Sequence, residues 1–264
     1  MALSRLDPDC GSFVCSDGAT LALYEWNAKA VGPPIILHHG FIANTEFNWT
    51  TPGITAALVA TGRRIIAFDA RCHGASQKIL DPTLISRKRM ARDVIEIAGH
   101  AGAEAYDLAG YSLGGFVAIV VAVEDPRMRR LALCGSCDQL FMDQLGDPDF
   151  GCVPAALRAE DPEAIASPNA RRFRKFADRT GADRLALAAC YEGFNADWRI
   201  SGEAVPNVHI PTLVIGGRDD PIMVGVERLT DAIPDNRLVW TEGDHFTALD
   251  DPKFALELVA FFEG

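Results

Sequence analysis

The serine at position 112 stands in a pattern that is typical of an activated nucleophile. Residues 110–115 read Gly-Tyr-Ser-Leu-Gly-Gly and contain a G-x-S-x-G motif, between a strand-like apolar run at 106–109 and a helix-like apolar run at 116–122. On such a sharp strand-to-helix turn the backbone of the serine is strained and its hydroxyl is exposed at the edge of a sheet. We therefore predict that Ser112 is a nucleophile. The alternative is a helix-capping serine in a glycine-rich turn.

A serine hydroxyl is essentially undissociated at neutral pH, so this chemistry needs a base, which is usually a histidine. His245 lies in the sequence Gly-Asp-His-Phe at 243–246, between the last predicted strand and the last predicted helix. That loop would open at the same sheet edge as Ser112, so we predict that His245 is the base. His38 and His39 precede a glycine turn and are expected to shape a loop. The other histidines have no comparable setting: His73, His100 and His209.

The base in turn needs a carboxylate, which fixes its tautomer and stabilises the imidazolium. Residues 216–221 follow a strong apolar run and read Gly-Gly-Arg-Asp-Asp-Pro, which offers two aspartates. We predict Asp220 as the triad acid, with Asp219 as the second candidate and Asp138 as the third. The alternative role for either of the paired aspartates is to cap a helix that begins at Pro221.

A tetrahedral intermediate also needs hydrogen-bond donors for its oxyanion. The backbone N–H of Leu113, directly after the proposed nucleophile, is one candidate. The second is the backbone N–H of Phe41, in the loop His-Gly-Phe at 39–41 that follows an early apolar run. The alternative is that Gly40 only turns the chain.

The segments that would position these residues alternate between strands and helices. Residues 12–26 alternate in polarity around Asp17-Gly18, which predicts an antiparallel hairpin. Further strands are predicted at 35–41, 64–69, 106–109, 130–134, 210–216 and 237–241, with helices at 51–61, 82–100, 116–122, 224–233 and 252–262. This alternation predicts a parallel sheet covered on both faces.

Residues 135–206 interrupt the alternation. They contain no strand-like apolar run, and the stretch is rich in alanine and arginine with helical spacing, as at 168–187. We interpret it as a small helical insertion between a core formed by residues 1–134 and 207–264. Its aromatic residues suggest an apolar pocket, although such residues more often only pack against the sheet: Phe141, Phe150, Phe173, Phe176, Tyr191, Phe194 and Trp198.

Composition narrows the class of protein. A chain of 264 residues can bury one large core. The formal charge of −11 disfavours a nucleic-acid partner. No run approaches the roughly 20 apolar residues that span a bilayer, and residues 1–8 lack the apolar core of a signal peptide, so we expect a cytoplasmic protein without a membrane partner.

The seven cysteines do not form a disulfide pattern, and we interpret Cys134 and Cys137 as buried thiols rather than a redox or metal site.

Taken together, the motifs resemble the α/β-hydrolase fold superfamily over nearly the whole chain. The segments that match lie at 39–41, 69–76, 110–115, 217–220 and 243–245. In that family, the loop after the second parallel strand usually reads D-x-R-G-x-G-x-S. This loop corresponds to residues 69–76 here, where Cys72 replaces a glycine, and we expect the substitution to distort the loop only slightly. The resemblance implies an α/β fold: a mostly parallel eight-stranded sheet with helices on both faces and a small helical lid after the sixth strand, at residues 135–206. The order nucleophile, acid, histidine is also the family's order.

This resemblance and the residues together predict a serine hydrolase that cleaves a small carboxylic ester or lactone through an acyl-enzyme, without a metal or organic cofactor. A serine rather than an aspartate at position 112 argues against the epoxide hydrolase and haloalkane dehalogenase branches. Alternatives on the same triad are a perhydrolase (cofactor-free haloperoxidase), a C–C bond hydrolase and a hydroxynitrile lyase. A ligand-binding receptor on a hydrolase scaffold is a further alternative. The expected partner is a small, partly apolar substrate, and the oligomeric state is left open.

Overall fold

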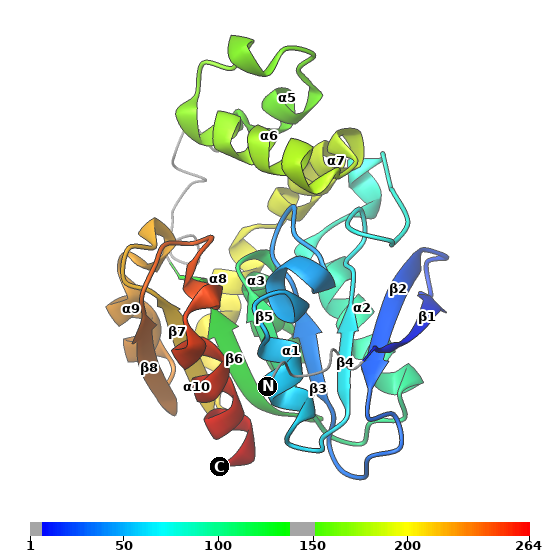
Figure 1. The fold of residues 1–264 in the computed structure, drawn as a ribbon, viewed down its shortest axis with the longest axis vertical. Coiled ribbons are helices and arrows are strands. Elements are labelled where there is room, and N and C mark those ends of the chain that lie inside the picture. The colour runs from blue at the N-terminus through cyan, green and yellow to red at the C-terminus, as the bar shows by residue number, and fades with distance from the viewer. Residues whose placement is uncertain (1–6, 138–150) are drawn as a thin grey trace.

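One sheet of eight strands forms the centre of the molecule (Figure 1). In the computed structural model, which describes residues 7–137 and 151–264, the strands lie in the order β1-β2-β4-β3-β5-β6-β7-β8. Their bounds are β1 Asp9–Val14, β2 Thr20–Trp26, β3 Ile35–His38, β4 Ile65–Phe68, β5 Tyr106–Tyr111, β6 Met128–Cys134, β7 Thr212–Gly217 and β8 Asn236–Thr241. The predicted eight-stranded α/β architecture is confirmed.

The sheet is mostly parallel. The hairpin predicted around Asp17 and Gly18 is present, with β1 antiparallel to β2 and Gly18 at a φ of 86°. Strand β2 is also antiparallel to β4, and every other neighbouring pair is parallel. Because parallel strands end at the same edge of a sheet, the loops after β3, β5, β7 and β8 open side by side.

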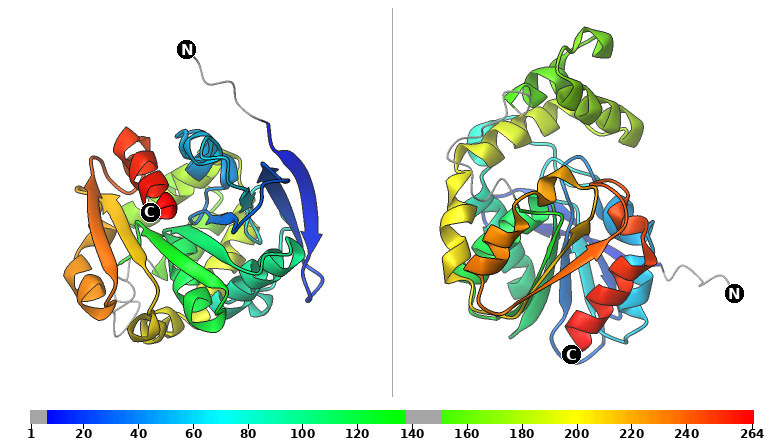
Figure 2. Two further views of the ribbon diagram at one scale, coloured as in Figure 1. Left: turned by 90° about the horizontal axis from the view of Figure 1, so that it is seen from below. Right: turned by 90° about the vertical axis from the view of Figure 1, so that its left-hand side faces the viewer.

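Alternating side chains of the central strands supply two core layers. Ile36, Leu108 and Leu133 belong to one buried cluster, whereas Leu37 and Ala109 belong to the other. This period of two is the one expected of a strand whose two faces are both covered. Helices accordingly cover both faces of the sheet (Figure 2).

The helices of the two layers follow the predicted segments closely. Helices α2 and α3 cover one face together with α9, and α1 and α10 cover the other. Their bounds are α1 Ile54–Val59, α2 Arg87–His100, α3 Leu113–Glu124, α9 Val226–Ala232 and α10 Pro252–Glu263. The predicted helix at 82–100 begins later than expected, because a short 3₁₀ turn at Pro82–Leu84 precedes Ser86, whose hydroxyl accepts the N–H of Arg89 and caps α2.

Four α-helices of the described residues, here called the helical insertion, lie between β6 and β7. They are α5 Val153–Arg158, α6 Pro168–Thr180, α7 Arg184–Ala196 and α8 Arg199–Ala204. The helical pattern at 168–187 is divided between α6 and α7, because Gly181 adopts a left-handed φ of 64° and Asp183 caps the next helix by accepting N–H bonds from its first turn. No strand lies between residues 151 and 211, as predicted.

The helical insertion has a small core of its own. Leu157, Ala177 and Leu187 are buried in it, from α5, α6 and α7. Helix α8 differs, because it packs against α3, and the hydroxyl of Ser201 donates to the carbonyl of Phe116 over 2.8 Å. The division into a core and a lid at residues 135 and 206 stays a prediction.

Two further expectations concern the membrane and the thiols. None of the helices in the described parts of the chain combines the length and apolar composition needed to cross a bilayer. The cytoplasmic location stays a prediction. Cys134 and Cys137 are both buried, as expected of small thiols packed in the core.

The contact of α3 with the sheet gives a stability prediction. A Cβ at Gly114 would lie 2.2 Å from the carbonyl oxygen of His38, which belongs to the backbone of β3 and cannot turn aside. We expect Gly114→Ala to lower the free energy of unfolding by about 3 kcal/mol or more. Gly11→Ala is the matched control, since nothing lies within 4 Å of its Cβ. Urea unfolding measures both, and equal effects of the two substitutions would contradict the packing argument.

Candidate active site

Ser112 lies at the turn between β5 and α3, where its backbone is strained. Its φ and ψ are 52° and −114°, a region that L residues rarely adopt. The tightness of the turn requires glycine on both sides, since a Cβ at Gly110 would lie 2.3 Å from the carbonyl oxygen of Gly114. A Cβ at Gly115 would meet the hydroxyl of Ser136 at 2.1 Å. The G-x-S-x-G motif therefore has the mechanical role that the sequence predicts.

The structure brings Ser112, His245 and Asp220 into one hydrogen-bonded chain. His245 Nε2 lies 3.0 Å from Ser112 Oγ, and its Nδ1 lies 2.8 Å from Asp220 Oδ2. A carboxylate only accepts hydrogen bonds, so Nδ1 bears the proton and Nε2 is free to accept the hydroxyl proton of the serine. The side chain of Asp220 is fully buried, whereas that of His245 is 15% exposed, so the imidazole alone of this pair reaches solvent.

The two aspartates after β7 have different surroundings. Asp220 also accepts the N–H of Ile222 at 2.8 Å through its second oxygen, so it caps a 3₁₀ turn as well as holding His245. Its neighbour Asp219 is exposed and contributes only a backbone N–H bond to the carbonyl of Gly243. Asp138, the third candidate, lies outside the described residues. The structure therefore places Asp220, and not Asp219, against the histidine.

Tyr111 is a site residue whose role the sequence did not reveal. Its hydroxyl donates to the carbonyl oxygen of His245 over 2.6 Å, and the two rings lie 5.3 Å apart. Burial, followed by nearby carboxylates such as Asp220, raises the pKa of the phenol well above its ordinary value, so it stays a neutral donor. Tyr111, the residue before Ser112, thus fixes the backbone of the loop that carries His245. Its position inside the G-x-S-x-G motif was the only feature of the sequence that pointed to Tyr111.

The two predicted oxyanion donors lie beside Ser112. A Cβ at Gly40 would lie 3.2 Å from the Cβ of Ser112, so the loop at 39–41 contacts the serine directly. The N–H of Gly40 donates to Asn48 Oδ1 over 2.7 Å. Among the described residues, no acceptor is bonded to the N–H of Phe41 or of Leu113. Both amides are therefore available to a ligand, and Asn48 is a second residue that the sequence analysis missed.

Three buried, neutral histidines support the loop at residues 39–41. His39 Nε2 accepts the N–H of Ala70 at 2.8 Å, so its Nδ1 bears the proton and donates to the carbonyl of Gly40. His38 and His73 donate through Nδ1 to the carbonyls of His39 and Arg71. Burial lowers the pKa of His38 to about 3 and lowers those of His39 and His73 as well. The expectation that His38 and His39 shape the loop is consistent with these contacts.

The loop at residues 69–76, in which Cys72 stands where the family usually has glycine, has a structural role. Cys72 adopts a φ of 72°, the left-handed region that favours glycine. Its thiol donates to the carbonyl of Ile79 and lies beside the thiol of Cys190 in α7. Asp69, at the start of the same loop, accepts the N–H groups of Thr45 and Ala75. The loop therefore joins the sheet to the helical insertion, and it lies outside the Ser112 chain of hydrogen bonds.

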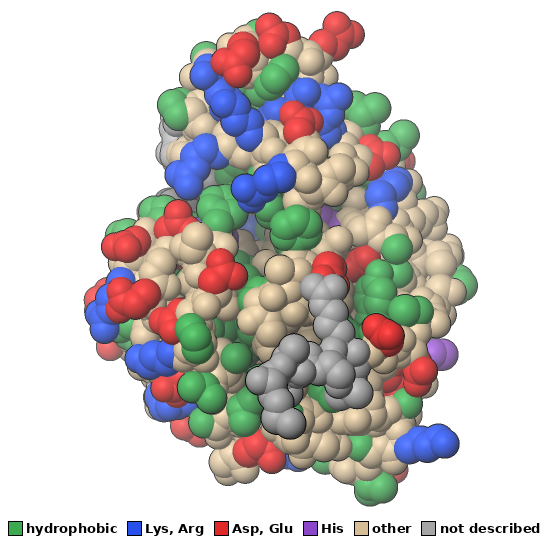
Figure 3. All heavy atoms as spheres, in the orientation of Figure 1, with side chains coloured by type: hydrophobic (Ala, Val, Ile, Leu, Met, Phe, Trp, Pro, Cys, Tyr) green, Lys and Arg blue, Asp and Glu red, His purple; other side chains and the backbone are tan. Residues whose placement is uncertain are grey.

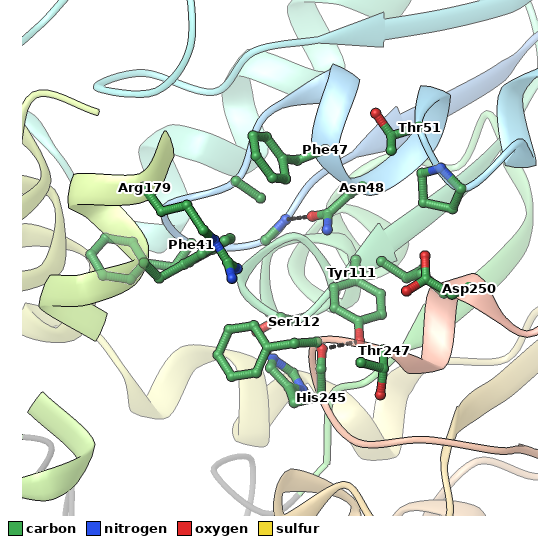
Figure 4. Close-up of a pocket in the computed structure, with 16 residues that line it drawn as sticks. Phe41, Phe47, Asn48, Thr51, Tyr111, Ser112, Arg179, His245, Thr247 and Asp250 are labelled. Atoms are coloured by element: carbon green, nitrogen blue, oxygen red, sulfur yellow. Dashed lines mark hydrogen bonds between the residues drawn. The ribbon is translucent and has the colours of Figure 1, made fainter. Parts of the chain in front are cut away.

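A pocket of about 370 Å³ opens over Ser112 (Figure 4). Its lining combines aromatic side chains with polar ones from four parts of the chain: the loop after β3, the turn between β5 and α3, helix α6 and the loop after β8. The aromatic residues are Phe41, Phe47, Tyr111, Phe176 and Phe246, and the polar and charged ones include Asn48, Thr51, Arg179, Thr247 and Asp250. Phe176, named in the sequence analysis as an aromatic of the insertion, lies in this wall.

A second, smaller pocket of about 60 Å³ lies on the other side of the serine. It shares Phe41, Ser112, His245 and Phe246 with the first pocket, and it adds mainly apolar side chains. The added residues are Leu113, Phe116, Phe173, Tyr191, Phe194, Asn195 and Ile222. The aromatic residues predicted to form an apolar pocket therefore do so in part, while Phe141 and Phe150 lie outside the described residues.

Comparison with known proteins assigns the family. Residues 35–257 match the model of the alpha/beta hydrolase family, and the chain belongs to that family. It is 28% identical over 235 residues to a putative carbamate hydrolase RutD of Variovorax paradoxus, covering 80% of this chain and 84% of the relative. It is 23% identical to 3-oxoadipate enol-lactonase 1 of Acinetobacter baylyi, covering 93% of each chain.

Solved structures agree on the fold. The enol-lactonase from Burkholderia xenovorans LB400 superposes with a TM-score of 0.78 at 20% identity, over 96% of this chain and all of that one. At this identity the likeness concerns the fold alone. Together with the family match, it establishes the chain as an enzyme of the α/β-hydrolase class, as the sequence motifs predicted.

The buried neutral histidines predict a loss of stability in mild acid. Their pKa values in the folded protein lie below the ordinary 6.5, so below about pH 6.5 the unfolded chain binds more protons and the free energy of unfolding falls as the pH falls. His38, whose pKa lies near 3, contributes about 1 kcal/mol of this loss between pH 6.5 and 5.5, and His39 and His73 add to it in the same direction. Urea unfolding at those two pH values measures it.

His38→Asn keeps a donor near the position of Nδ1 but cannot titrate. We expect this variant to lose about 1 kcal/mol less than the parent between the two pH values, whatever its stability at pH 6.5. An unfolding free energy that stays constant from pH 6.5 to 5.5 in the parent would show that the imidazoles are not held neutral.

Proposed function

We propose that this protein is a serine hydrolase that cleaves a small carboxylic ester or lactone through an acyl-enzyme. The observation that supports this most directly is the hydrogen-bonded chain from Asp220 through His245 to Ser112, with distances of 2.8 and 3.0 Å. These three residue types in this order are the arrangement that activates a serine hydroxyl for attack on a carbonyl carbon.

In the first half of the reaction, Ser112 Oγ attacks the carbonyl carbon and its proton passes to His245 Nε2. The imidazolium that forms is stabilised by the buried carboxylate of Asp220, which stays ionised throughout. His245 then gives the proton to the leaving oxygen, and the acyl group stays on Ser112. The Tyr111 bond to the backbone of His245 holds the ring in place during both transfers.

The negative charge that develops on the carbonyl oxygen is stabilised by the N–H groups of Phe41 and Leu113. A preorganised pair of amides of this kind contributes on the order of 3 kcal/mol per donor to the transition state. Leu113 is the first residue of α3, so the positive end of the helix dipole adds to the effect. Asn48 fixes the loop by accepting the N–H of Gly40, which leaves the next amide free.

In the second half, a water molecule attacks the acyl-enzyme while His245 Nε2 accepts its proton. The proton then returns to Ser112 Oγ as the acid is released, which restores the starting state. The net reaction adds one water across the acyl bond, and it requires no metal or organic cofactor.

The class of substrate is proposed from the pockets and the relatives. The two pockets on either side of Ser112 offer space for the two parts of an ester or for one ring of a lactone. The names of the relatives specify a lactone and a carbamate, both of which are acyl compounds cleaved by water. We place this protein with them as an acyl hydrolase of small molecules.

Short p-nitrophenyl esters and simple lactones test this function. We expect the parent protein to turn over members of this panel and Ser112→Ala to lose that turnover by about a thousandfold or more, because the nucleophile is removed. Release of p-nitrophenolate and of acid measures the rates. Absence of turnover with every ester and lactone, alongside cleavage of vinylogous diketones or release of cyanide, would contradict the proposal in favour of the C–C hydrolase or hydroxynitrile lyase alternatives.

The paired aspartates offer a matched test of the triad acid. Asp220→Asn would leave His245 without a charged acceptor and is expected to lower kcat by about a thousandfold or more. Asp219→Asn removes the same charge one residue away, at an exposed side chain, and is expected to change kcat by less than twofold. Equal losses in the two variants would show that Asp220 does not orient the histidine.

A further inference from the structure

Helix α6 carries five cationic side chains, and Arg179 differs from the other four. Each of the others has a carboxylate within 4.0 Å: Arg171 and Lys175 lie near Glu163, Arg172 near Asp244 and Arg174 near Asp178. In the parts of the chain that the structure describes, no acidic side chain forms an ion pair with Arg179. Its guanidinium carbon lies 5.1 Å from the centre of the Phe176 ring.

Arg179 is also the one cationic side chain in the lining of the described pocket over Ser112. It reaches from α6 toward the space above Ser112 and Phe41, as the close-up shows (Figure 4). Lysine and arginine side chains gather on the helical insertion above the pocket (Figure 3). A protein with a formal charge of −11 thus presents, at its candidate active site, a positive charge that has no ion-pair partner among the described residues.

The opposite wall of the pocket is acidic. Asp250 lies at the end of the 3₁₀ turn Ala248–Asp250 after β8, across from Arg179 (Figure 4). An anionic group in the pocket is therefore attracted to one end and repelled from the other. The smaller pocket on the other side of Ser112 is mainly apolar and has no aspartate, glutamate, lysine or arginine in its lining. Together these features define one direction for a substrate that carries a single negative charge.

We propose that the substrate is an ester or lactone that carries a carboxylate, and that Arg179 binds this carboxylate while the scissile carbonyl lies at Ser112. This inference rests on the proposed hydrolase function and specifies its substrate class. A guanidinium presents a planar pair of N–H donors that matches a carboxylate. The apolar remainder of the substrate occupies the smaller pocket. Hydrolysis leaves this carboxylate unchanged, so Arg179 is a specificity residue and takes no part in the proton transfers.

A carboxylate fits this site better than a phosphate group. The pocket offers one guanidinium, with the carboxylate of Asp250 in the same cavity, so a second negative charge on the ligand would have no partner. Inhibition by free anions distinguishes the two chemistries, with adipate as the dicarboxylate probe and inorganic phosphate as the other. We expect adipate to inhibit more strongly than phosphate, and the reverse order would overturn the assignment to a carboxylate.

Matched ester pairs test the role of Arg179. The p-nitrophenyl monoester of adipic acid is compared with that of adipamic acid, in which an uncharged carboxamide replaces the carboxylate. A second pair, 4-carboxyphenyl acetate and 4-carbamoylphenyl acetate, places the charge on the leaving group. The measured quantity is the ratio of kcat/KM for the carboxylate over kcat/KM for the carboxamide, which cancels any general loss of activity. We expect a ratio above one for the parent protein in at least one pair.

Arg179→Gln is expected to lower that ratio about tenfold, and Arg179→Lys to lower it less. Asp250→Asn is expected to raise it, because the repelling charge is removed. Lys175→Gln is the matched control: it removes one positive charge one turn earlier on α6, outside the pocket over Ser112, and should leave the ratio within twofold.

The outcomes separate the two proposals. A fall of the ratio in the first pair assigns the carboxylate to the acyl part of the substrate, and a fall in the second pair assigns it to the leaving group. Neutral esters turned over at rates that depend on Ser112, with ratios that Arg179→Gln leaves unchanged in both pairs, would overturn the carboxylate site and retain the hydrolase function. No turnover by the parent protein of any of the four esters, nor of any ester or lactone in the panel above, would refute the hydrolase function and the carboxylate site together.

Discussion

The close approach of α3 to the sheet is the constraint on which the site depends. Gly110 and Gly114 let the helix and strand backbones come near enough that no Cβ fits between them, and this forces Ser112 into a φ of 52°. Such a backbone costs on the order of 1–3 kcal/mol and persists only because the surrounding packing determines it. The strain presents the hydroxyl of Ser112 to His245, which arrives from a loop more than a hundred residues later in the chain and meets it at 3.0 Å.

Buried polar groups then hold the loops around this turn. His39 bonds to Ala70 and to its own neighbour Gly40, and Asn48 accepts the N–H of Gly40, so the loop after β3 keeps one conformation beside the serine. Tyr111 holds the loop that carries His245, because its neutral hydroxyl donates to the backbone carbonyl of His245. The buried carboxylate of Asp220 is the only acidic side chain that contacts His245 through a hydrogen bond among the described residues.

The sequence was informative wherever a local pattern has one mechanical meaning. The alternation of apolar runs predicted the strands and a mostly parallel sheet, and the motifs predicted Ser112, His245 and Phe41 because parallel strands end at one edge. The choice between Asp219 and Asp220 depends on which side chain turns inward after β7, and only the structure shows this. The roles of Tyr111 and Asn48 depend on contacts between distant loops. Among the described residues, Arg179 is the one cationic side chain of α6 that lacks a carboxylate partner. This depends on how the helical insertion folds, and the sequence pattern at 168–187 did not show that this stretch is divided into two helices.

The central claim is that the packing around Ser112 makes its hydroxyl a nucleophile. Reaction with a fluorophosphonate probe, followed by digestion and mass spectrometric mapping of the adduct, tests this without knowledge of the substrate. The account predicts one stoichiometric adduct on the peptide that contains Ser112, and formation of that adduct should slow by about a hundredfold or more in His245→Ala, because the base is lost. A folded protein that forms no adduct, or that forms it at another serine such as Ser136, would contradict the account.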